Sequence, residues 1–198
     1  MRGKLICFEG IDGSGKGTQV RAMQGREPSS ILFTYPDKSW PIGRVISSFL
    51  KKTVSLSPAH QFLLYLADIY KDQERIRAML ESGKTVVLDR YIFSTLAYQD
   101  ASGFEIKRGV GIAKELGFLP PDITFLIDID PKTSVLRKRK QNNSLERFEK
   151  QRFLARVRKN YLSLAKEKFL SKKWLVVDGR KGKADMAEEI RLLVLKSR

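Results

Sequence analysis

A glycine-rich segment near the start of the chain restricts the fold more than any other feature. Residues 8–18 read FEGIDGSGKGT and overlap the end of the apolar run at 5–8. Four glycines let the backbone turn tightly and point successive N–H groups at one anion. The lysine adds a positive charge, and the helix expected after it directs its N-terminus to the same point. The order of strand, loop and helix therefore predicts a phosphate-binding loop rather than a glycine-rich turn with an incidental lysine.

This loop differs at one position from the pattern G-x-x-x-x-G-K-[ST]. Gly17 takes the place of the hydroxyl residue, and Thr18 follows it. The hydroxyl at that place usually ligates Mg²⁺, so its loss predicts a more hydrated ion. An acidic side chain at the end of a neighbouring strand is expected to hold that ion through water.

Short apolar runs alternate with helical stretches along the whole chain. Strands are expected near residues 4–9, 31–35, 84–89, 122–128 and 174–178. Helices are expected near residues 16–25, 41–52, 57–82, 90–101, 106–116, 131–141, 147–170 and 184–196. Because helical crossovers join parallel strands, this order predicts an α/β protein of three layers, with a five-stranded parallel sheet flanked by helices. No linker divides the chain, so residues 1–198 are expected to form a single domain.

Two segments carry additional signals. The helix at 57–82 begins with Ser57 and Pro58 and is followed by Gly83, which are typical N-cap, first-turn and C-cap residues. It is more apolar than a one-sided surface helix needs, so we expect it in the core or at a dimer interface. The stretch at 137–149 is the least core-like part of the chain, and its polar centre predicts a mobile excursion between two helices.

Composition excludes several classes of protein. No apolar run approaches the roughly 18 residues of a membrane span. The single cysteine, Cys7, cannot form an internal disulfide, and no signal segment precedes the first strand, so we expect a cytoplasmic protein. The single histidine, His60, argues against most zinc sites and Ser-His-Asp triads.

The positive charge of the chain is large and unevenly placed. The formal net charge is +16, and residues 131–173 hold 15 lysines and arginines against three glutamates. Such a face can bind nucleic acid, bind a polyanionic small molecule, or remain solvated. The segment lacks the interleaved aromatic residues of single-strand-binding proteins, so nucleic acid is not expected as a partner.

A second group of chemically active residues, Asp89-Arg90-Tyr91, ends the third expected strand. In an open parallel sheet the carboxyl ends of the strands face the ligand crevice. There Asp89 can hold hydrated Mg²⁺, and Arg90 can stabilise charge on a transferred phosphoryl group. The alternative is a surface Asp–Arg pair that caps the next helix.

Six motifs follow one another along the chain. They are FEGIDGSGKGTQ, YPDK at 35–38, LLYLAD at 63–68, DRYIFSTLAYQ at 89–99, LERFE at 145–149 and VVDG at 176–179. Their order and approximate spacing resemble those of thymidylate kinases, over nearly the whole chain, and the fourth motif is the most specific. The resemblance implies a nucleoside-monophosphate kinase that transfers the γ-phosphate of Mg·ATP to dTMP, giving dTDP and ADP, and usually forms a homodimer.

The resemblance assigns ATP to the phosphate-binding loop. The expected contacts are Gly10, Ile11, Asp12, Gly13, Ser14, Gly15, Lys16, Gly17 and Thr18, together with Gly179. Lys16 and the loop backbone would hold the phosphates, Thr18 would reach the α-phosphate, and Asp89 would hold Mg²⁺ through water. The resemblance also makes residues 137–149 a small helical lid. Thymidylate kinases with glycine at the place of residue 13 take catalytic cations from this lid. In this chain the candidates are Arg137, Arg139 and Arg147.

The same resemblance assigns dTMP to a second group of residues. The expected contacts are Asp12, Tyr35, Lys38, Tyr65, Arg90, Ser94, Tyr98 and Phe148. Asp12 would bond the 3′-hydroxyl, and Arg90 would bridge the acceptor and the γ-phosphate. Tyr65 would stack on thymine, Tyr98 would form a wall of the pocket, and Lys38 would hold the acceptor phosphate. Lys16, Arg90 and Asp12 are thus the expected catalytic residues, with the lid arginines.

The chain departs from the family pattern near the base. Ile69 stands where family members commonly carry an arginine that hydrogen-bonds thymine. Without that bond, discrimination between bases is expected to weaken by about 1.5–3 kcal/mol unless another residue substitutes. The segment 26–28 (REP) resembles a family substrate motif but precedes the second strand, so we interpret it as a short loop. A kinase for dUMP or for a deoxynucleoside is an alternative, and a P-loop ATPase that binds nucleic acid is a remote one. Lys38 and Arg90 favour a phosphorylated acceptor.

Overall fold

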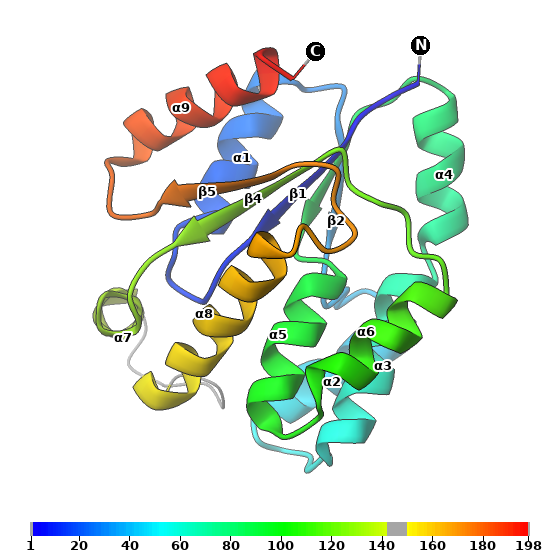
Figure 1. Ribbon diagram of the computed structural model, residues 1–198, viewed down its shortest axis with the longest axis vertical. Coiled ribbons are helices and arrows are strands. Elements are labelled where there is room, and N and C mark those ends of the chain that lie inside the picture. Colours follow the sequence, from blue (N-terminus) through cyan, green and yellow to red (C-terminus); the bar gives the residue numbers. More distant parts are fainter. Residues whose placement is uncertain (1, 142–149, 198) are drawn as a thin grey trace.

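The architecture is a parallel sheet with helices on both faces (Figure 1). This computed structural model describes residues 2–141 and 150–197. The strands are β1 (Leu5–Glu9), β2 (Ile31–Thr34), β3 (Val86–Asp89), β4 (Ile123–Asp128) and β5 (Trp174–Asp178). They pair in the order β2-β3-β1-β4-β5, all in parallel. The predicted strands and the three-layer α/β class are confirmed.

Helices connect these strands. They are α1 (Lys16–Arg26), α2 (Pro41–Leu50), α3 (Pro58–Tyr70), α4 (Gln73–Glu81), α5 (Ile92–Ser102), α6 (Ile106–Glu115), α7 (Pro131–Gln141), α8 (Gln151–Lys166) and α9 (Lys183–Leu195). Within the described chain, no helix is long and apolar enough to cross a membrane.

The side chains of β1 show how the sheet is covered. Leu5 and Cys7 belong to a core that also contains residues of α3, α4, α5 and α8. Ile6 and Phe8 belong to a second core, shared with α1 and α9. Successive side chains of a strand point to opposite faces, so an uninterrupted apolar run is what a strand buried on both faces requires.

The prediction of one long helix at 57–82 is wrong, because α3 and α4 take its place. The break falls at Lys71 and Asp72. Lys71 Nζ lies 2.8 Å from Asp72 Oδ2 and 3.3 Å from both Asp68 Oδ1 and Asp37 Oδ2. These ion pairs join the end of α3 to the loop that follows β2. Tertiary contacts of polar side chains therefore override the apolar periodicity of the segment.

The helix predicted at 147–170 is shorter than expected at its C-terminal end. Its helix α8 ends at Lys166, and residues 147–149 lie outside the described residues. Lys168 and Leu170 adopt left-handed backbone angles, with φ of 50° and 58°. A right-handed helix cannot continue through such residues.

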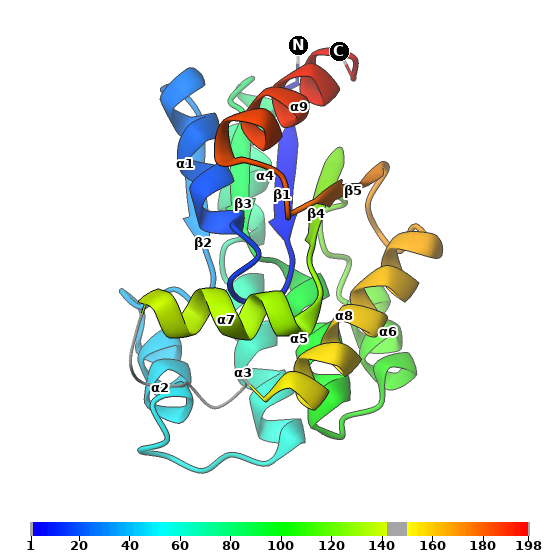
Figure 2. The ribbon, with the colours of Figure 1, turned by 90° about the vertical axis from the view of Figure 1, so that its left-hand side faces the viewer.

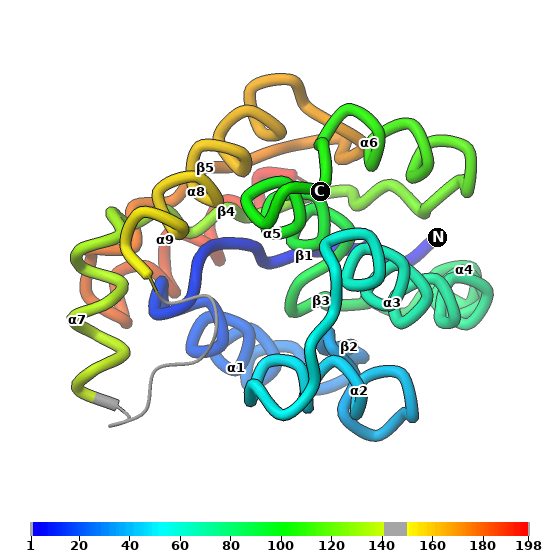
Figure 3. The backbone as a smooth tube through the Cα atoms, turned by 90° about the horizontal axis from the view of Figure 1, so that it is seen from below, coloured from blue at the N-terminus to red at the C-terminus, as the bar shows by residue number. Residues whose placement is uncertain are grey.

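The carboxyl ends of the central strands lie next to one helix. Figure 2 shows α7 lying across the ends of β1 and β4. Seen from below, the chain leaves β1 between α8 and α1, with α7 beside it (Figure 3). The glycine-rich loop, the end of β3 and the start of α7 are therefore brought together at the edge of the sheet where ligands bind in open α/β folds.

Candidate active site

The glycine-rich loop has the conformation of an anion-binding turn. It ends at Gly15, whose left-handed backbone precedes α1, and α1 has no acidic residue in its first turn. Gly13 has a φ of 74°, and a Cβ at this position would lie 2.9 Å from the carbonyl oxygen of Ser134 in α7. A side chain at residue 13 would thus collide with the helix over the loop. Ser14 has a buried Oγ without a partner among the described residues.

Other loop residues contribute in different ways. Ile11 packs its side chain into the core, so only its backbone can face a phosphate. Gly10 and Gly17 flank the turn, and Gly17 lies beside Asp89, whose Oδ2 would be 3.9 Å from a Cβ there. Thr18 lies in the first turn of α1, where its N–H donates to Gly15.

The loop directs Lys16 toward the end of β3. Its Nζ lies 4.0 Å from Asp89 Oδ1, and the side chain is almost buried. Burial, followed by the charge of Arg90, lowers the pKa of Lys16. The expected cation, at the start of α1, and the expected acidic residue, at the end of β3, thus lie close together.

Arg90 lies on the other side of the loop. Its Nη2 donates to Asp12 Oδ1 at 2.5 Å, and its Nη1 donates to Ser94 Oγ at 3.0 Å. Burial raises the pKa of Asp12, but the charges of Arg90 and Lys16 outweigh burial and hold that pKa below its usual value. Asp12 is therefore a carboxylate at neutral pH, and it pairs with Arg90.

A cavity of about 270 Å³ adjoins these residues, somewhat below the range of about 300–1,000 Å³ typical of ligand pockets. Its lining includes Asp12, Lys16, Thr34, Tyr35, Pro36, Lys38, Leu50, Tyr65, Ile69, Asp89, Arg90, Tyr91, Ser94, Thr95, Tyr98 and Gln99. All expected dTMP contacts within the described chain line this cavity. The remaining one, Phe148, lies outside the described residues. We call this space the acceptor cavity.

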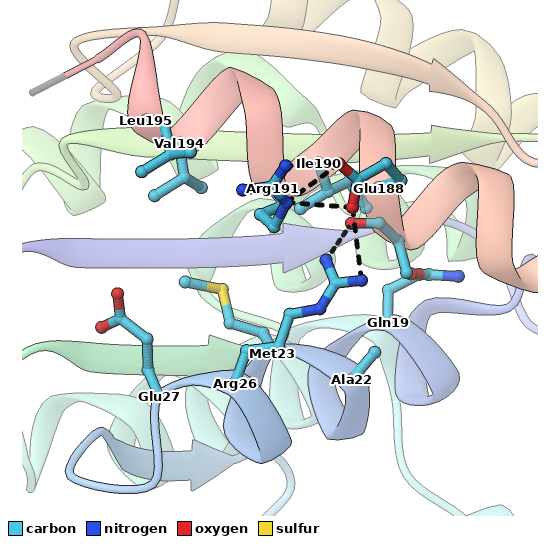
Figure 4. A pocket seen from close by; sticks show the side chains of 11 residues that line it. Gln19, Ala22, Met23, Arg26, Glu27, Glu188, Ile190, Arg191, Val194 and Leu195 are labelled. Carbon is cyan, nitrogen blue, oxygen red and sulfur yellow. Dashed lines mark hydrogen bonds and ion pairs between the residues drawn. The ribbon is translucent and has the colours of Figure 1, made fainter.

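A larger cavity, of about 530 Å³, lies between α1 and α9. Figure 4 shows the two helices facing each other across it, with Glu188 paired to both Arg26 and Arg191. No residue expected at the active site lines it. Arg26 and Glu27, from the segment that resembles a substrate motif, do line it, so that segment lies away from the acceptor cavity.

The helix α7 ties the loop to the segment after β5. Arg137 Nη1 donates to the carbonyl oxygens of Gly179, at 2.9 Å, and Gly13, at 3.4 Å. Ser134 Oγ donates to the carbonyl oxygen of Asp12 at 2.6 Å. Arg139, two residues after Arg137, is exposed. The two arginines therefore have different surroundings, and the third candidate, Arg147, lies outside the described residues.

The residues fit a hydrated magnesium ion held mainly by a substrate. Among the described residues, no group of three His, Cys, Asp or Glu side chains could hold a metal. Mg²⁺ commonly keeps several waters and binds one or two carboxylates plus substrate phosphates. Asp89, beside Gly17 and Lys16, supplies one such carboxylate.

Sequence reasoning missed several buried polar residues of the site. Thr95 Oγ1 and Gln99 Oε1 are buried at the acceptor cavity without partners among the described residues. Glu9 and Tyr161 form a hydrogen-bonded cluster behind Arg90. Glu9 could have been noticed, because a charged residue at the end of an apolar strand is unusual. Tyr161 could not, because it falls at an apolar position in the pattern of α8 and resembles any other core residue.

A phosphate-binding loop that opens onto an acceptor cavity lined by cations and aromatic rings defines a P-loop phosphotransferase. Sequence comparison narrows this class. The family model of thymidylate kinases matches residues 8–190, and the chain belongs to that family.

Individual relatives agree with this assignment. A thymidylate kinase of Leptospira borgpetersenii serovar Hardjo-bovis is 33% identical over 200 residues, covering 98% of this chain and 94% of that protein. One of Schizosaccharomyces pombe is 32% identical over 170 residues, covering 84% and 79%. The solved structure of thymidylate kinase from Candida albicans, an enzyme described as having broad substrate specificity, superimposes with a TM-score of 0.82 at 28% identity. It covers 98% of this chain and 92% of that one.

Proposed function

We infer that the protein transfers the γ-phosphate of ATP to dTMP, giving dTDP and ADP. Membership of the thymidylate kinase family supports this activity. The main structural support for this activity is that Asp12, Lys16 and Arg90 lie together where the phosphate-binding loop opens onto the acceptor cavity. A phosphoryl group transferred from ATP on the loop to an acceptor in the cavity must pass these three residues.

Catalysis in this proposal is mainly electrostatic. The N–H groups of the loop and Lys16 bind the β- and γ-phosphates, and Arg90 contacts the phosphoryl group between donor and acceptor. Binding of dTMP exchanges the Asp12–Arg90 pair for two new contacts, with Asp12 on the 3′-hydroxyl and Arg90 on phosphate oxygens. Mg²⁺, held through water by Asp89, would neutralise charge on the ATP phosphates.

Recognition of the base rests on stacking and on two uncharged groups. Tyr65 and Tyr98 line the acceptor cavity and supply aromatic faces for the pyrimidine and sugar. Ile69, which replaces the usual arginine, is buried and lines the same cavity. We propose that Thr95 and Gln99 bond the base edge instead, because buried polar atoms without partners gain most from a ligand that pairs with them.

A coupled assay of ADP formation tests the acceptor. The panel contains dTMP, dUMP, dCMP, AMP, GMP and thymidine, each with Mg·ATP. We expect the highest kcat/KM for dTMP, with dUMP next. A clear preference for AMP, GMP or thymidine would overturn the assignment to dTMP, and hydrolysis of ATP without any acceptor would favour an ATPase.

We also propose that the enzyme works as a homodimer in the cytoplasm. Leu63 and Tyr70 of α3 are 55% and 43% exposed, a high value for large apolar side chains on a helix that also contributes to the core. The free thiol of Cys7, buried in β1, suits a reducing compartment. Sedimentation equilibrium of the wild type and of Leu63→Glu tests the dimer, since a charge at this face is expected to yield monomers.

A further inference from the structure

Glu9 places a carboxylate at the buried end of β1. Its side chain is 0% exposed. A buried carboxylate is costly unless hydrogen bonds and a nearby cation compensate for the lost water. Burial raises the pKa of Glu9, and the charge of Arg90 opposes that rise. The residue does not line the acceptor cavity, so its carboxylate acts on neighbouring side chains and not directly on a substrate.

Both oxygens of this carboxylate are occupied by residues around Arg90. Glu9 Oε1 accepts from the backbone N–H of Tyr91 at 2.8 Å and from that of Ser94 at 3.2 Å. Glu9 Oε2 accepts from Ser94 Oγ at 2.6 Å and from the hydroxyl of Tyr161 at 2.9 Å. Helix α5 has no side-chain cap of its own at Tyr91. The carboxylate from β1 therefore accepts from two N–H groups at the start of α5, of which that of Ser94 also donates to the carbonyl of Tyr91 at 3.0 Å.

The same partners hold Arg90. Its Nη1 donates to Ser94 Oγ at 3.0 Å and to the hydroxyl of Tyr161 at 3.4 Å. The backbone of Arg90 has a φ of 73°, a left-handed conformation that a side chain adopts only where its surroundings enforce it. The carbonyl of Phe8 accepts from the N–H of Arg90 at 3.0 Å, while Glu9 accepts from the next N–H. The end of β1 thus holds the peptide groups on both sides of Arg90.

We propose that Glu9 is a positioning residue for phosphoryl transfer. It fixes the left-handed turn at Arg90 and, through Ser94 and Tyr161, the orientation of the guanidinium. This role rests on the proposed function, since it matters only if Arg90 contacts the transferred group. A cation held in place before the reaction stabilises developing charge without reorganising, so loosening it lowers kcat more than it weakens binding.

The test is a double-mutant cycle between Glu9→Gln and Arg90→Ala. Glutamine keeps the shape and one acceptor oxygen, but it removes the charge and makes the other atom a donor. With the best acceptor of the panel, Glu9→Gln is expected to lower kcat by about 10- to 100-fold and to change the KM for ATP by less than about twofold. In the Arg90→Ala background it should change kcat by less than about twofold, since the two residues act as one unit.

Thr124→Val is the matched control. Thr124, near the amino end of β4, is also 0% exposed, and its hydroxyl donates to Ser171 Oγ at 2.8 Å. This variant should lower the unfolding temperature while leaving kcat unchanged. An unchanged kcat in Glu9→Gln would overturn the proposal. So would an equal loss with and without Arg90, which would mean that Glu9 acts by itself or only through stability.

Two further measurements test the role of Glu9 if the first variant does not fold or if dTMP is not the best acceptor. If Glu9→Gln does not fold, Tyr161→Phe removes one link to Glu9 and Arg90 without removing a charge. It is expected to lower kcat about three- to tenfold in the wild type and not in Arg90→Ala, and an unchanged kcat contradicts the proposal. If the wild type prefers an acceptor other than dTMP, the proposed function fails, but the cycle is run with that acceptor and still tests Glu9.

Discussion

Replacing Lys71 with methionine should cost far more stability than a surface lysine does. Its Nζ lies between the carboxylates of Asp37, Asp68 and Asp72, at 3.3, 3.3 and 2.8 Å. The lysine side chain is 11% exposed and that of Asp68 is 0% exposed. Removing one partner of a buried ion pair typically costs about 3–5 kcal/mol, because a charge is left uncompensated. Here three carboxylates lose their shared cation, so we expect a loss within this range.

Urea unfolding measures this loss. With an m-value of about 2 kcal/mol per molar urea, the midpoint of Lys71→Met should fall by about 1.5–2.5 M relative to the wild type. Lys172→Met is the matched control, since Lys172 is 56% exposed and pairs with Asp122 at 2.6 Å. An exposed pair contributes less than about 1 kcal/mol. Equal midpoints for the two variants would refute the argument.

The pH dependence provides a second readout of the same cluster. Burial raises the pKa of Asp68, so its ionisation destabilises the fold at pH values above the ordinary carboxyl pKa of about 4. Without Lys71 this penalty grows. The deficit of Lys71→Met should therefore be complete near pH 7 and shrink as pH falls toward 4. A deficit that stays constant over this range would show that lost packing, not charge, is the cause.

Four more outcomes follow from the site. Lys16→Ala and Arg90→Ala should each lower kcat by 100-fold or more while the protein stays folded, and near wild-type turnover would remove that residue from the mechanism. Arg139→Ala should lower kcat at saturating nucleotides, whereas Arg137→Ala should mainly raise the KM for ATP, because Arg137 bonds Gly179; the opposite pattern would exchange their roles. Gly179→Ala should destabilise the fold by about 1–3 kcal/mol, because its Cβ would lie 2.6 Å from Ile129 Cγ2, while Gly111→Ala, with open space around it, should not. Ile69→Arg should raise the preference for dTMP over dCMP about tenfold or more, since a guanidinium bonds the thymine carbonyl but not the cytosine amino group.

The sheet could be predicted from the sequence because its rules are local. Each strand is a short apolar run, and nearly all side chains of the three central strands, β1, β3 and β4, are buried. The acceptor cavity was predictable for another reason. Asp12, Tyr35 and Arg90 follow the carboxyl ends of β1, β2 and β3, and a parallel sheet gathers those ends at one edge. Tyr65 of α3 and Tyr98 of α5, from the other motifs, also line the cavity.

The break between α3 and α4 could not be predicted in the same way. Residues 57–82 keep a helical pattern throughout, and nothing local distinguishes Lys71 from a surface lysine. Its three carboxylate partners include Asp37, which is 34 positions away in the loop after β2. The Asp12–Arg90 pair could not be predicted for the same reason, because its two residues belong to separate motifs that meet only after β1 and β3 have paired.

The segment 8–13 joins the two halves of the site through its own backbone and side chains. On the acceptor side, Phe8 and Glu9 accept hydrogen bonds from the backbone at Arg90 and the start of α5. On the donor side, the carbonyls of Asp12 and Gly13 accept from Ser134 and Arg137 of α7. These six consecutive residues therefore set the position of Arg90 relative to the phosphate-binding loop, through hydrogen bonds to the start of α5 on one side and to α7 on the other.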